Sequence, residues 1–243
     1  MKRGSSGEDA RARLEAVAAE HGLGEVALER LAGVVDLVSS DPLAPTSLRE
    51  PAEVVDVHVA DSLSALPALE ALAPGLIADV GSGAGFPGVP IAIARPQSAM
   101  DLVEASRRSC EFLERLRAAV GLERLRIVNR RAEDWAREDG RTRYDVVVVR
   151  AVAPLPVLLE YAAPLLRDGG TVIAWKGGEE EPGAAEAADL LGMELVGEVP
   201  TRPYPASRRR RLHLYRRVRP VPDQVPRRAG MARKRPLGRK TGG

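Results

Sequence analysis

The sequence predicts an α/β protein with a Rossmann-like, doubly wound and mostly parallel sheet of seven strands, preceded by a helical cap. From residue 76 onward, short runs rich in Val and Ile alternate with segments of helical spacing, and a turn with four glycines in eight residues follows the first run. An alternation of strands and helices implies parallel strands that are covered on both faces. A chain of 243 residues can also bury a core large enough for a cofactor cavity.

The first 66 residues predict the cap and a connecting loop. Apolar residues at helical spacing predict helices over 9–20 and 25–38, and the Ser- and Pro-rich stretch 39–51 predicts a loop. Pro51 suits the first turn of a third helix that runs to about Leu66.

The sheet is expected within residues 67–218, and residues 219–243 form a basic tail. The last two strands follow a helix, and one of them is expected to run antiparallel as a hairpin partner. The strands are predicted at 76–80, 100–104, 125–129, 144–149, 170–175, 193–199 and 211–218. The helices between them are predicted at 87–94, 106–120, 133–138, 155–166 and 183–191.

Charge is divided unevenly along the chain. Residues 202–243 hold 15 of the 36 Lys and Arg and one acid, Asp223, so their formal charge is +14, whereas the preceding residues sum to −12. A basic segment of this kind is either solvated and disordered or a surface that contacts a polyanion.

Composition argues against several classes of protein. The apolar stretches are shorter than the roughly 20 residues that span a bilayer, and charges interrupt the N-terminus where a signal peptide needs an apolar run. We therefore expect a cytoplasmic protein without membrane attachment, and a monomer. The single cysteine, Cys110, excludes an internal disulfide, and the three dispersed histidines make a metal site improbable.

The glycine-rich turn is the strongest candidate for a ligand site. In an open doubly wound sheet, ligands bind beyond the carboxyl ends of the strands, which is where Gly81, Gly83 and Gly85 lie. Residues 83–88 match the dinucleotide fingerprint GxGxxG. Asp79, however, would repel a pyrophosphate, and Phe86-Pro87 interrupts the entry into the following helix.

S-adenosylmethionine has the character that this site favours, because it joins an adenosine to a zwitterionic amino acid and a sulfonium cation without phosphate. Asp79 and the glycine backbone would hold its methionine end, and Glu104 would hold the ribose hydroxyls. Ala132 and Glu133 would contact the adenine. Glycine-rich turns also serve as plain connections, and Glu104 also suits a surface carboxylate at a strand end.

Several segments together resemble the RsmG (GidB) family, which methylates N7 of guanine in 16S ribosomal RNA of the small subunit. The similarity runs from about residue 46 to 237, and its most selective segments are GSGAGFPG (81–88), RAVAPL (150–155) and PRRAG (226–230). This resemblance implies a class I S-adenosylmethionine-dependent methyltransferase. It also implies cofactor contacts from Gly81, Phe86, Ala132, Glu133 and Arg150.

The resemblance further implies that His58, Asp61, Lys176, Arg227 and Arg228 lie around the reaction cleft or on the RNA path. Arg233 and Lys234 of the same tail are additional candidates for RNA contact. The loop LVSSDPLAPTSLREP keeps Thr46 but lacks the asparagines usual in the family, which leaves the role of those amides open.

The chemistry of guanine N7 requires no obvious base. Its lone pair is free at neutral pH, so alignment and exclusion of water suffice. Methylation of a pyrimidine C5 would need a thiolate, and Cys110 lies in a helical run as packing.

His58, Arg150 and Lys176 are the candidates for a catalytic role, although each also suits a structural one: a half-buried histidine, an arginine paired with Asp145 or Glu133, and a surface lysine. Trp135 and Trp175 are either base-stacking platforms or core. Two rival functions are an NAD(P)-dependent Rossmann reductase and a non-catalytic RNA-binding assembly factor.

Overall fold

The computed structural model describes residues 3–150, 153–177 and 181–238. Residues 151–152 of the RAVAPL segment and the tail residues 239–243 lie outside this range. Within the described residues, no helix is long and apolar enough to cross a membrane.

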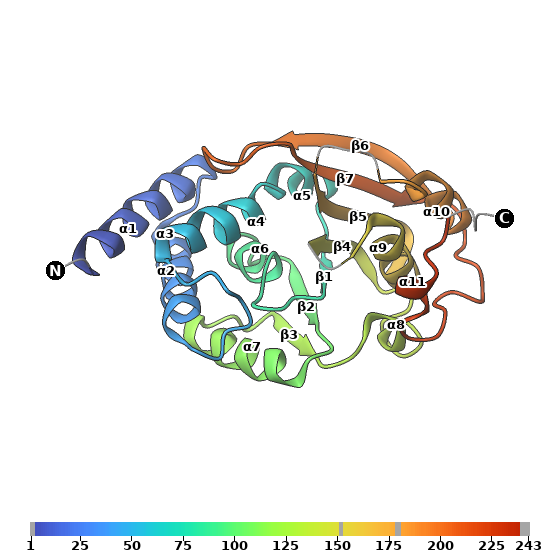
Figure 1. Ribbon diagram of the computed structural model, residues 1–243, viewed down its shortest axis with the longest axis horizontal. Coiled ribbons are helices and arrows are strands. Elements are labelled where there is room, and N and C mark those ends of the chain that lie inside the picture. Colours follow the sequence, from blue (N-terminus) through green and yellow to red (C-terminus); the bar gives the residue numbers. More distant parts are fainter. Residues whose placement is uncertain (1–2, 151–152, 178–180, 239–243) are drawn as a thin grey trace.

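A seven-stranded sheet forms the centre of the molecule, with strand order β3-β2-β1-β4-β5-β7-β6 (Figure 1). The strands β1 to β5 are parallel, and β7 is antiparallel to both β5 and β6. The expected antiparallel strand is thereby confirmed. Strand order reverses between β1 and β4, which places the switch point of the sheet beside the glycine-rich turn. The strands are β1 (Leu76–Val80), β2 (Ala99–Val103), β3 (Leu125–Val128), β4 (Tyr144–Arg150), β5 (Leu166–Lys176), β6 (Met193–Thr201) and β7 (Arg210–Arg217).

Helices cover both faces of this sheet. On one face lie the N-terminal helices and the crossovers α1 (Arg3–Glu20), α2 (Glu25–Ser40), α5 (Leu66–Leu72), α6 (Gly88–Ala94) and α7 (Arg107–Val120). On the other face lie α8 (Ala132–Trp135), α9 (Leu155–Ala162), a short 3₁₀ turn (Ala163–Leu165), α10 (Ala184–Leu190) and α11 (Met231–Lys234).

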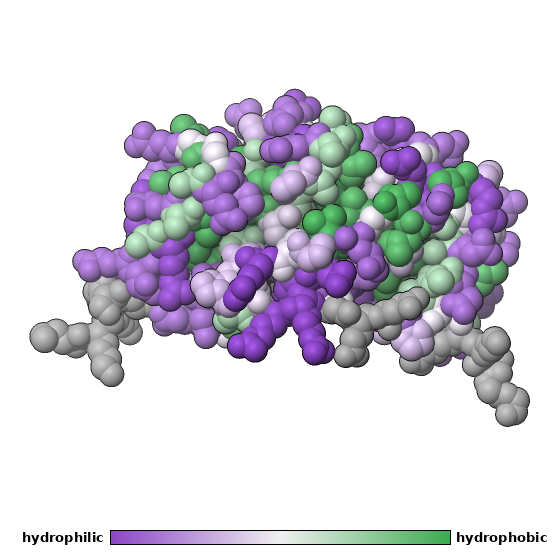
Figure 2. Space-filling view, turned by 90° about the horizontal axis from the view of Figure 1, so that it is seen from above, coloured by the Kyte–Doolittle hydropathy of each residue, from purple (hydrophilic) through white to green (hydrophobic). Residues whose placement is uncertain are grey.

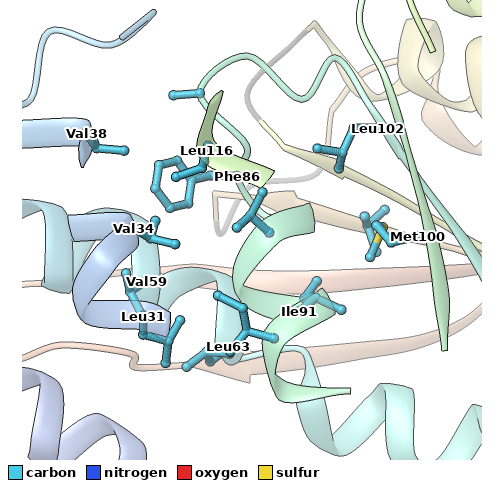
Figure 3. Close-up of a cluster of buried hydrophobic side chains, with 14 of the residues drawn as sticks. Leu31, Val34, Val38, Val59, Leu63, Phe86, Ile91, Met100, Leu102 and Leu116 are labelled. Carbon is cyan, nitrogen blue, oxygen red and sulfur yellow. The ribbon is translucent and has the colours of Figure 1, made fainter. Parts of the chain in front are cut away.

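The cap shares its hydrophobic core with the sheet. Leu31 and Val34 of α2 pack in one buried cluster with Phe86, Met100 and Leu116 (Figure 3). Because neighbouring residues of a strand point to opposite faces, Val146 and Val148 join this cluster while Val147 and Val149 join the other. The cap is therefore packed directly on the sheet.

The segment expected as one helix from Pro51 to Leu66 is more complex. It consists of α3 (Pro51–Glu53), a π-helix (Val54–Ala60) and α4 (Asp61–Leu63), and α5 follows after a short break. The regular α-helix of the sequence interpretation is thus wrong in detail. Apolar spacing over seven residues does not distinguish the wider π turn, which often occurs at functional sites.

The basic tail is folded against the body as far as Gly238. Val221, Val225 and Ala232 are buried in the cluster that contains α8 and α9. Arg137 and Arg141 donate to the carbonyls of Pro226 and Val225 at 2.8 and 3.1 Å. The description of this segment as solvated and disordered is wrong for residues 219–238.

Exposed apolar side chains gather over β6 and β7, the face seen from above in Figure 2. The large apolar residues that are exposed here are Leu195, Val196 and Val199 on β6, Val218 after β7, and Leu190 at the end of α10. The strand β6 forms an edge of the sheet.

Candidate functional site

A cavity of about 650 Å³ opens at the carboxyl ends of β1 to β4. This volume lies within the range of small-molecule sites, about 300–1,000 Å³. Its lining includes the turn 81–84, Glu104 after β2, the segment 130–133 after β3 and Arg150 at the end of β4. The wall also includes His58, the predicted cofactor contact Phe86, Thr46 in the loop, and Gly230 in the tail.

The glycine turn presents its backbone to this cavity through Gly81 and Gly83. Gly83 has a φ of +54°, and a Cβ built on it would meet only the Gly81 carbonyl, at 3.9 Å. Gly85, in contrast, does not line the cavity. A Cβ there would lie 2.7 Å from Val89 and 3.3 Å from Leu113, so Gly85 allows close packing between the turn and α7. The prediction that Gly85 binds the cofactor is corrected accordingly.

Glu104 is held rigidly at the cavity wall. One carboxylate oxygen accepts the Gly83 N–H at 2.9 Å, and the other accepts the Ser106 N–H at 2.7 Å. Each oxygen keeps a free lone pair, so the carboxylate can still accept two hydroxyl hydrogens from a ribose. This geometry supports the predicted role.

Asp79 lies behind the turn and does not line the cavity. Its side chain is fully buried, and one oxygen accepts the Gly88 N–H at 2.9 Å. Burial raises the pKa of Asp79 to about 7. The predicted contact with the methionine end is therefore wrong. Asp79 instead occupies the N-terminus of α6, where a dinucleotide site would bind its pyrophosphate.

Glu133 joins the end of β3 to the tail. It is 5% exposed, and one carboxylate oxygen accepts the Gly230 N–H at 3.0 Å. Ala132 and Glu133 both line the cavity, and so do Gly230 and Arg233. The tail therefore forms part of the wall at the position expected for the adenine.

Arg150 connects β4 to the π-helix. Its Nη1 donates to Asp61 Oδ2 at 3.0 Å and to the Val57 carbonyl at 3.1 Å. Neither Asp145 nor Glu133, the partners considered from the sequence, binds it in these contacts. Burial lowers the pKa of Arg150, but arginine stays charged in proteins. Arg150 is thus both a structural anchor and a lining residue of the cavity.

His58 is stacked on Phe86, with ring centroids 4.4 Å apart. Its Nε2 lies 3.1 Å from Thr46 Oγ1, and its Nδ1 lies 3.3 Å from Arg150 Nη2. Burial, followed by the charge of Arg150, lowers the pKa of His58 to about 4. The ring is therefore neutral at pH 7, so it does not act as a cation toward RNA.

Lys176 and Arg227 are engaged within the protein. Lys176 Nζ lies 2.5 Å from Glu181 and donates to the Ala153 carbonyl at 3.0 Å. Arg227 forms two hydrogen bonds with Glu160, at 2.7 and 2.5 Å. The predicted pair of guanidinium groups for RNA is therefore split: Arg227 anchors the tail, whereas Arg228 is exposed. Arg233 and Lys234 are exposed as well.

Both tryptophans belong to the core. Trp135 donates to the Tyr144 hydroxyl at 2.8 Å, and Trp175 donates to the Asp61 carbonyl at 2.8 Å. They are 6% and 3% exposed, which decides against base-stacking platforms. Cys110 is also buried, as expected of packing.

Two contributors to this region were not singled out from the sequence: Glu160 and the backbone of Gly230. Glu160 lies within the apolar run LPVLLEYAAPLL and is 1% exposed. A lone acid in such a run signals a buried partner of opposite charge. The contact of Gly230 is made by its backbone, which no residue pattern reveals.

Comparisons with known proteins show the family of this chain. The model of the GidB family, described as rRNA small subunit methyltransferase G, matches residues 42–202. A ribosomal RNA small subunit methyltransferase G from Rubrobacter xylanophilus is 45% identical over 196 residues, which cover 78% of this chain and 75% of that protein. Its counterpart from Symbiobacterium thermophilum is 40% identical over 238 residues, which cover 90% of this chain and 96% of that protein. The chain belongs to the GidB family. Membership makes it an S-adenosylmethionine-dependent methyltransferase, as the resemblance predicted.

Solved structures confirm the fold of this GidB-family chain. A Burkholderia thailandensis 1,6-didemethyltoxoflavin-N1-methyltransferase aligns with a TM-score of 0.53 at 16% identity, covering 76% of this chain and 88% of that one. A ribosomal protein L11 methylase from Lactobacillus delbrueckii aligns with a TM-score of 0.50 at 19% identity, covering 66% of this chain and 77% of that one. Both likenesses show the Rossmann-like methyltransferase fold.

Proposed function

We propose that this chain transfers the methyl group of S-adenosylmethionine to N7 of a specific guanine in 16S ribosomal RNA. The relatives are named for a methyl transfer to small-subunit ribosomal RNA, and the family resemblance adds the guanine N7. The proposal includes the RNA or a ribosomal particle as partner, action in the cytoplasm, and a monomeric enzyme.

The observation that carries the proposal is a carboxylate placed to accept ribose hydroxyls, Glu104, beside a helix N-terminus that Asp79 already occupies. Glu104 and Glu133 line the cavity, and Asp79 accepts the first N–H of α6. A pyrophosphate at the start of α6 would find the Gly88 N–H already taken by Asp79. The wall also carries Arg130, Arg131, Arg150 and Arg233, so it is the occupied helix N-terminus, and not the net charge of the cavity, that argues against phosphate. An adenosine ligand without phosphate fits these donors and acceptors, which argues against a reductase that binds NAD(P).

Residues at the ends of successive strands would each bind a different part of S-adenosylmethionine. Ala132 and Glu133 after β3 would hold the adenine, Glu104 after β2 the ribose, and the backbone of Gly81 and Gly83 the methionine end beside the sulfonium. When bound, S-adenosylmethionine supplies an electrophilic methyl group on a sulfonium centre. The protein then needs to align guanine N7 with that methyl group and to exclude water.

The buried groups near the cavity support a mechanism without a general base. His58 is a poor proton acceptor, because its pKa is lowered to about 4 and both of its ring nitrogens are engaged, by Thr46 and Arg150. Cys110 donates to the Glu104 carbonyl at 3.4 Å, and burial raises the pKa of its thiol. A neutral thiol held in this way is unsuited to the nucleophilic attack that C5 methylation requires.

Methylation of small-subunit RNA by the purified protein tests the proposal. The protein is incubated with labelled S-adenosylmethionine and with the RNA, either naked or as a particle, and modified guanines are mapped by aniline cleavage after reduction. We expect one cleavage site that depends on the enzyme. Binding of S-adenosylhomocysteine without any methylation of either substrate would favour a non-catalytic assembly factor instead.

A further inference from the structure

The loop between α2 and α3 places a hydroxyl in the wall of the cavity. Arg49 holds this loop by donating to the carbonyls of Val38, Asp41 and Ala44 at 2.7–2.8 Å. One guanidinium that binds three carbonyls fixes the backbone of a loop that has no regular structure of its own. The Thr46 side chain, which lines the cavity, is therefore held in place before any ligand binds.

The hydrogen bonds around His58 have only one consistent direction. The guanidinium of Arg150 has donors and no acceptor, so His58 Nδ1, 3.3 Å from Nη2, must accept. A ring that accepts at Nδ1 is neutral and carries its proton on Nε2. Nε2 therefore donates to Thr46 Oγ1, 3.1 Å away.

Both lone pairs of the Thr46 hydroxyl are consequently used within the protein. One accepts from His58 Nε2, and the other accepts the Leu48 N–H at 3.2 Å. A hydroxyl has two acceptor positions and one hydrogen. The Thr46 hydroxyl hydrogen is thus left to donate toward the cavity, and His58 and the Leu48 N–H set the direction in which it points.

Arg150 adds further donors at the same end of the cavity. Its Nη1 is used by Asp61 and Val57, and one N–H of Nη2 is used by His58. Of its five N–H groups, these contacts leave one on Nη2 and one on Nε. The cation and the Thr46 hydroxyl therefore converge at the end of β4, two strands away from β2 and its ribose-binding candidate Glu104.

We propose that the Thr46 hydroxyl and Arg150 together bind the α-carboxylate of the methyl donor, with His58 as the positioning residue that turns Thr46 into a donor. Donors and a cation at this end complement a carboxylate, and they lie opposite the adenine and ribose positions. This assignment rests on the proposed function. It gives the atypical loop 39–51 a defined role.

Calorimetric titration with two ligands tests the contact without using activity. S-adenosylhomocysteine contains the carboxylate, whereas 5′-methylthioadenosine lacks the whole amino acid. We expect Thr46→Val to weaken S-adenosylhomocysteine binding roughly 10- to 100-fold, the range for a hydrogen bond to a charged group, and to leave 5′-methylthioadenosine binding unchanged. Thr46→Ser keeps the hydroxyl and should bind both ligands as the wild type does.

An equal loss for both ligands, or no loss for either, would overturn the assignment. Failure of the wild-type protein to bind S-adenosylhomocysteine would instead count against the proposed function, so the two failures are distinct.

The tautomer of His58 provides a second readout. Long-range ¹H–¹⁵N correlation spectra at pH 7 should show a protonated Nε2 and an unprotonated Nδ1 for this ring. His58→Phe keeps an aromatic ring on Phe86 but cannot donate, so its preference for S-adenosylhomocysteine over 5′-methylthioadenosine should fall. A ring protonated on Nδ1, or an unchanged preference in His58→Phe, would contradict the positioning role.

Discussion

Gly83 allows the cofactor site to be tested with a matched control. Its φ is +54°, and the space beside it is open to the cavity. Gly83→Arg would fill that space at a cost in backbone strain of about 1–3 kcal/mol. We expect the variant to fold, as judged by circular dichroism, and to lose binding of S-adenosylhomocysteine.

Gly22 is the control for strain alone. It has a φ of +62° with nothing within 4 Å of an added Cβ, and it follows α1, away from the cavity-lining residues. Gly22→Arg should therefore have a similar cost in stability and keep the wild-type affinity. Unchanged affinity in Gly83→Arg would reject the glycine turn as the binding surface.

His58 predicts a specific loss of stability in acid. Its pKa is about 4 in the folded protein, whereas the ordinary value, which we assign to the unfolded chain, is 6.5. Between these values the unfolded chain binds more protons, so stability falls as the pH falls from about 6.5 to 4, by up to about 3 kcal/mol. Asp79, whose pKa is raised to about 7, has the opposite effect, because its extra proton stabilises the folded state as the pH falls.

Because these two effects oppose each other, the contribution of His58 to the pH dependence of stability is measured by comparing the wild type with a His58 variant. Urea unfolding of the wild type and of His58→Gln, at pH 7.5 and at pH 4.5, should show a smaller acid-induced loss in the variant. The same loss in both proteins would mean that this ring takes up a proton in the folded state with an ordinary pKa.

At the scale of elements, apolar periodicity predicted the sheet well, because each strand has its own buried residues. The first four predicted strands agree with the structure within one residue at each end. β5 was expected to begin at 170 but begins at Leu166, since Asp168, Gly169 and Gly170 resemble a turn in sequence. The π-helix was missed because its hydrogen-bond register leaves no mark on composition.

The sequence predicted the site residues whose side chains contact the cavity. It predicted less well those whose position depends on a backbone contact or on an ion pair inside the protein. Glu104 and Arg150 line the cavity as expected from their positions at strand ends. Asp79 was misplaced because a strand-end acid can face either the ligand or the following helix. The pair of Arg227 with Glu160 depends on residues 67 positions apart, which spacing cannot bring together.

The Arg227–Glu160 pair predicts that the tail supports cofactor binding. Glu160 is 1% exposed, and removing its partner would leave a buried carboxylate unpaired at a cost of about 3–5 kcal/mol. Arg227→Ala should release the turn that contains Gly230 and its contact with Glu133. We therefore expect weaker binding of S-adenosylhomocysteine and a lower melting temperature.

Two further variants separate stability from positioning. Arg228→Ala, the exposed neighbour, should keep the wild-type affinity for the cofactor. Combining Glu160→Ala with Arg227→Ala removes the unpaired charge and should recover stability, whereas cofactor affinity should stay low. Wild-type affinity in Arg227→Ala would show that the tail wall is dispensable.

At the scale of the whole molecule, the formal charge of the C-terminal segment overstates its capacity for RNA. Several of its cations are paired with acids of the body or of β6: Arg211 with Glu198 at 3.6 Å, and Arg219 with Asp189 at 2.5 Å. Arg228 and Lys234 are exposed on the segment that also contributes Gly230 and Arg233 to the cavity wall. Cations beside the cavity are the ones placed to contact RNA whose guanine enters it.

This distribution predicts how RNA affinity depends on salt. Each phosphate contact on a single strand contributes about 0.7 to the slope of log affinity against log salt concentration. Arg228→Ala combined with Lys234→Ala should therefore reduce the slope by about 1.4, with S-adenosylhomocysteine affinity unchanged. Arg211→Ala combined with Arg219→Ala removes the same charge from the paired cations and should leave the slope nearly as it was. Equal reductions in both variants would show that RNA responds to total charge and not to the cations beside the cavity.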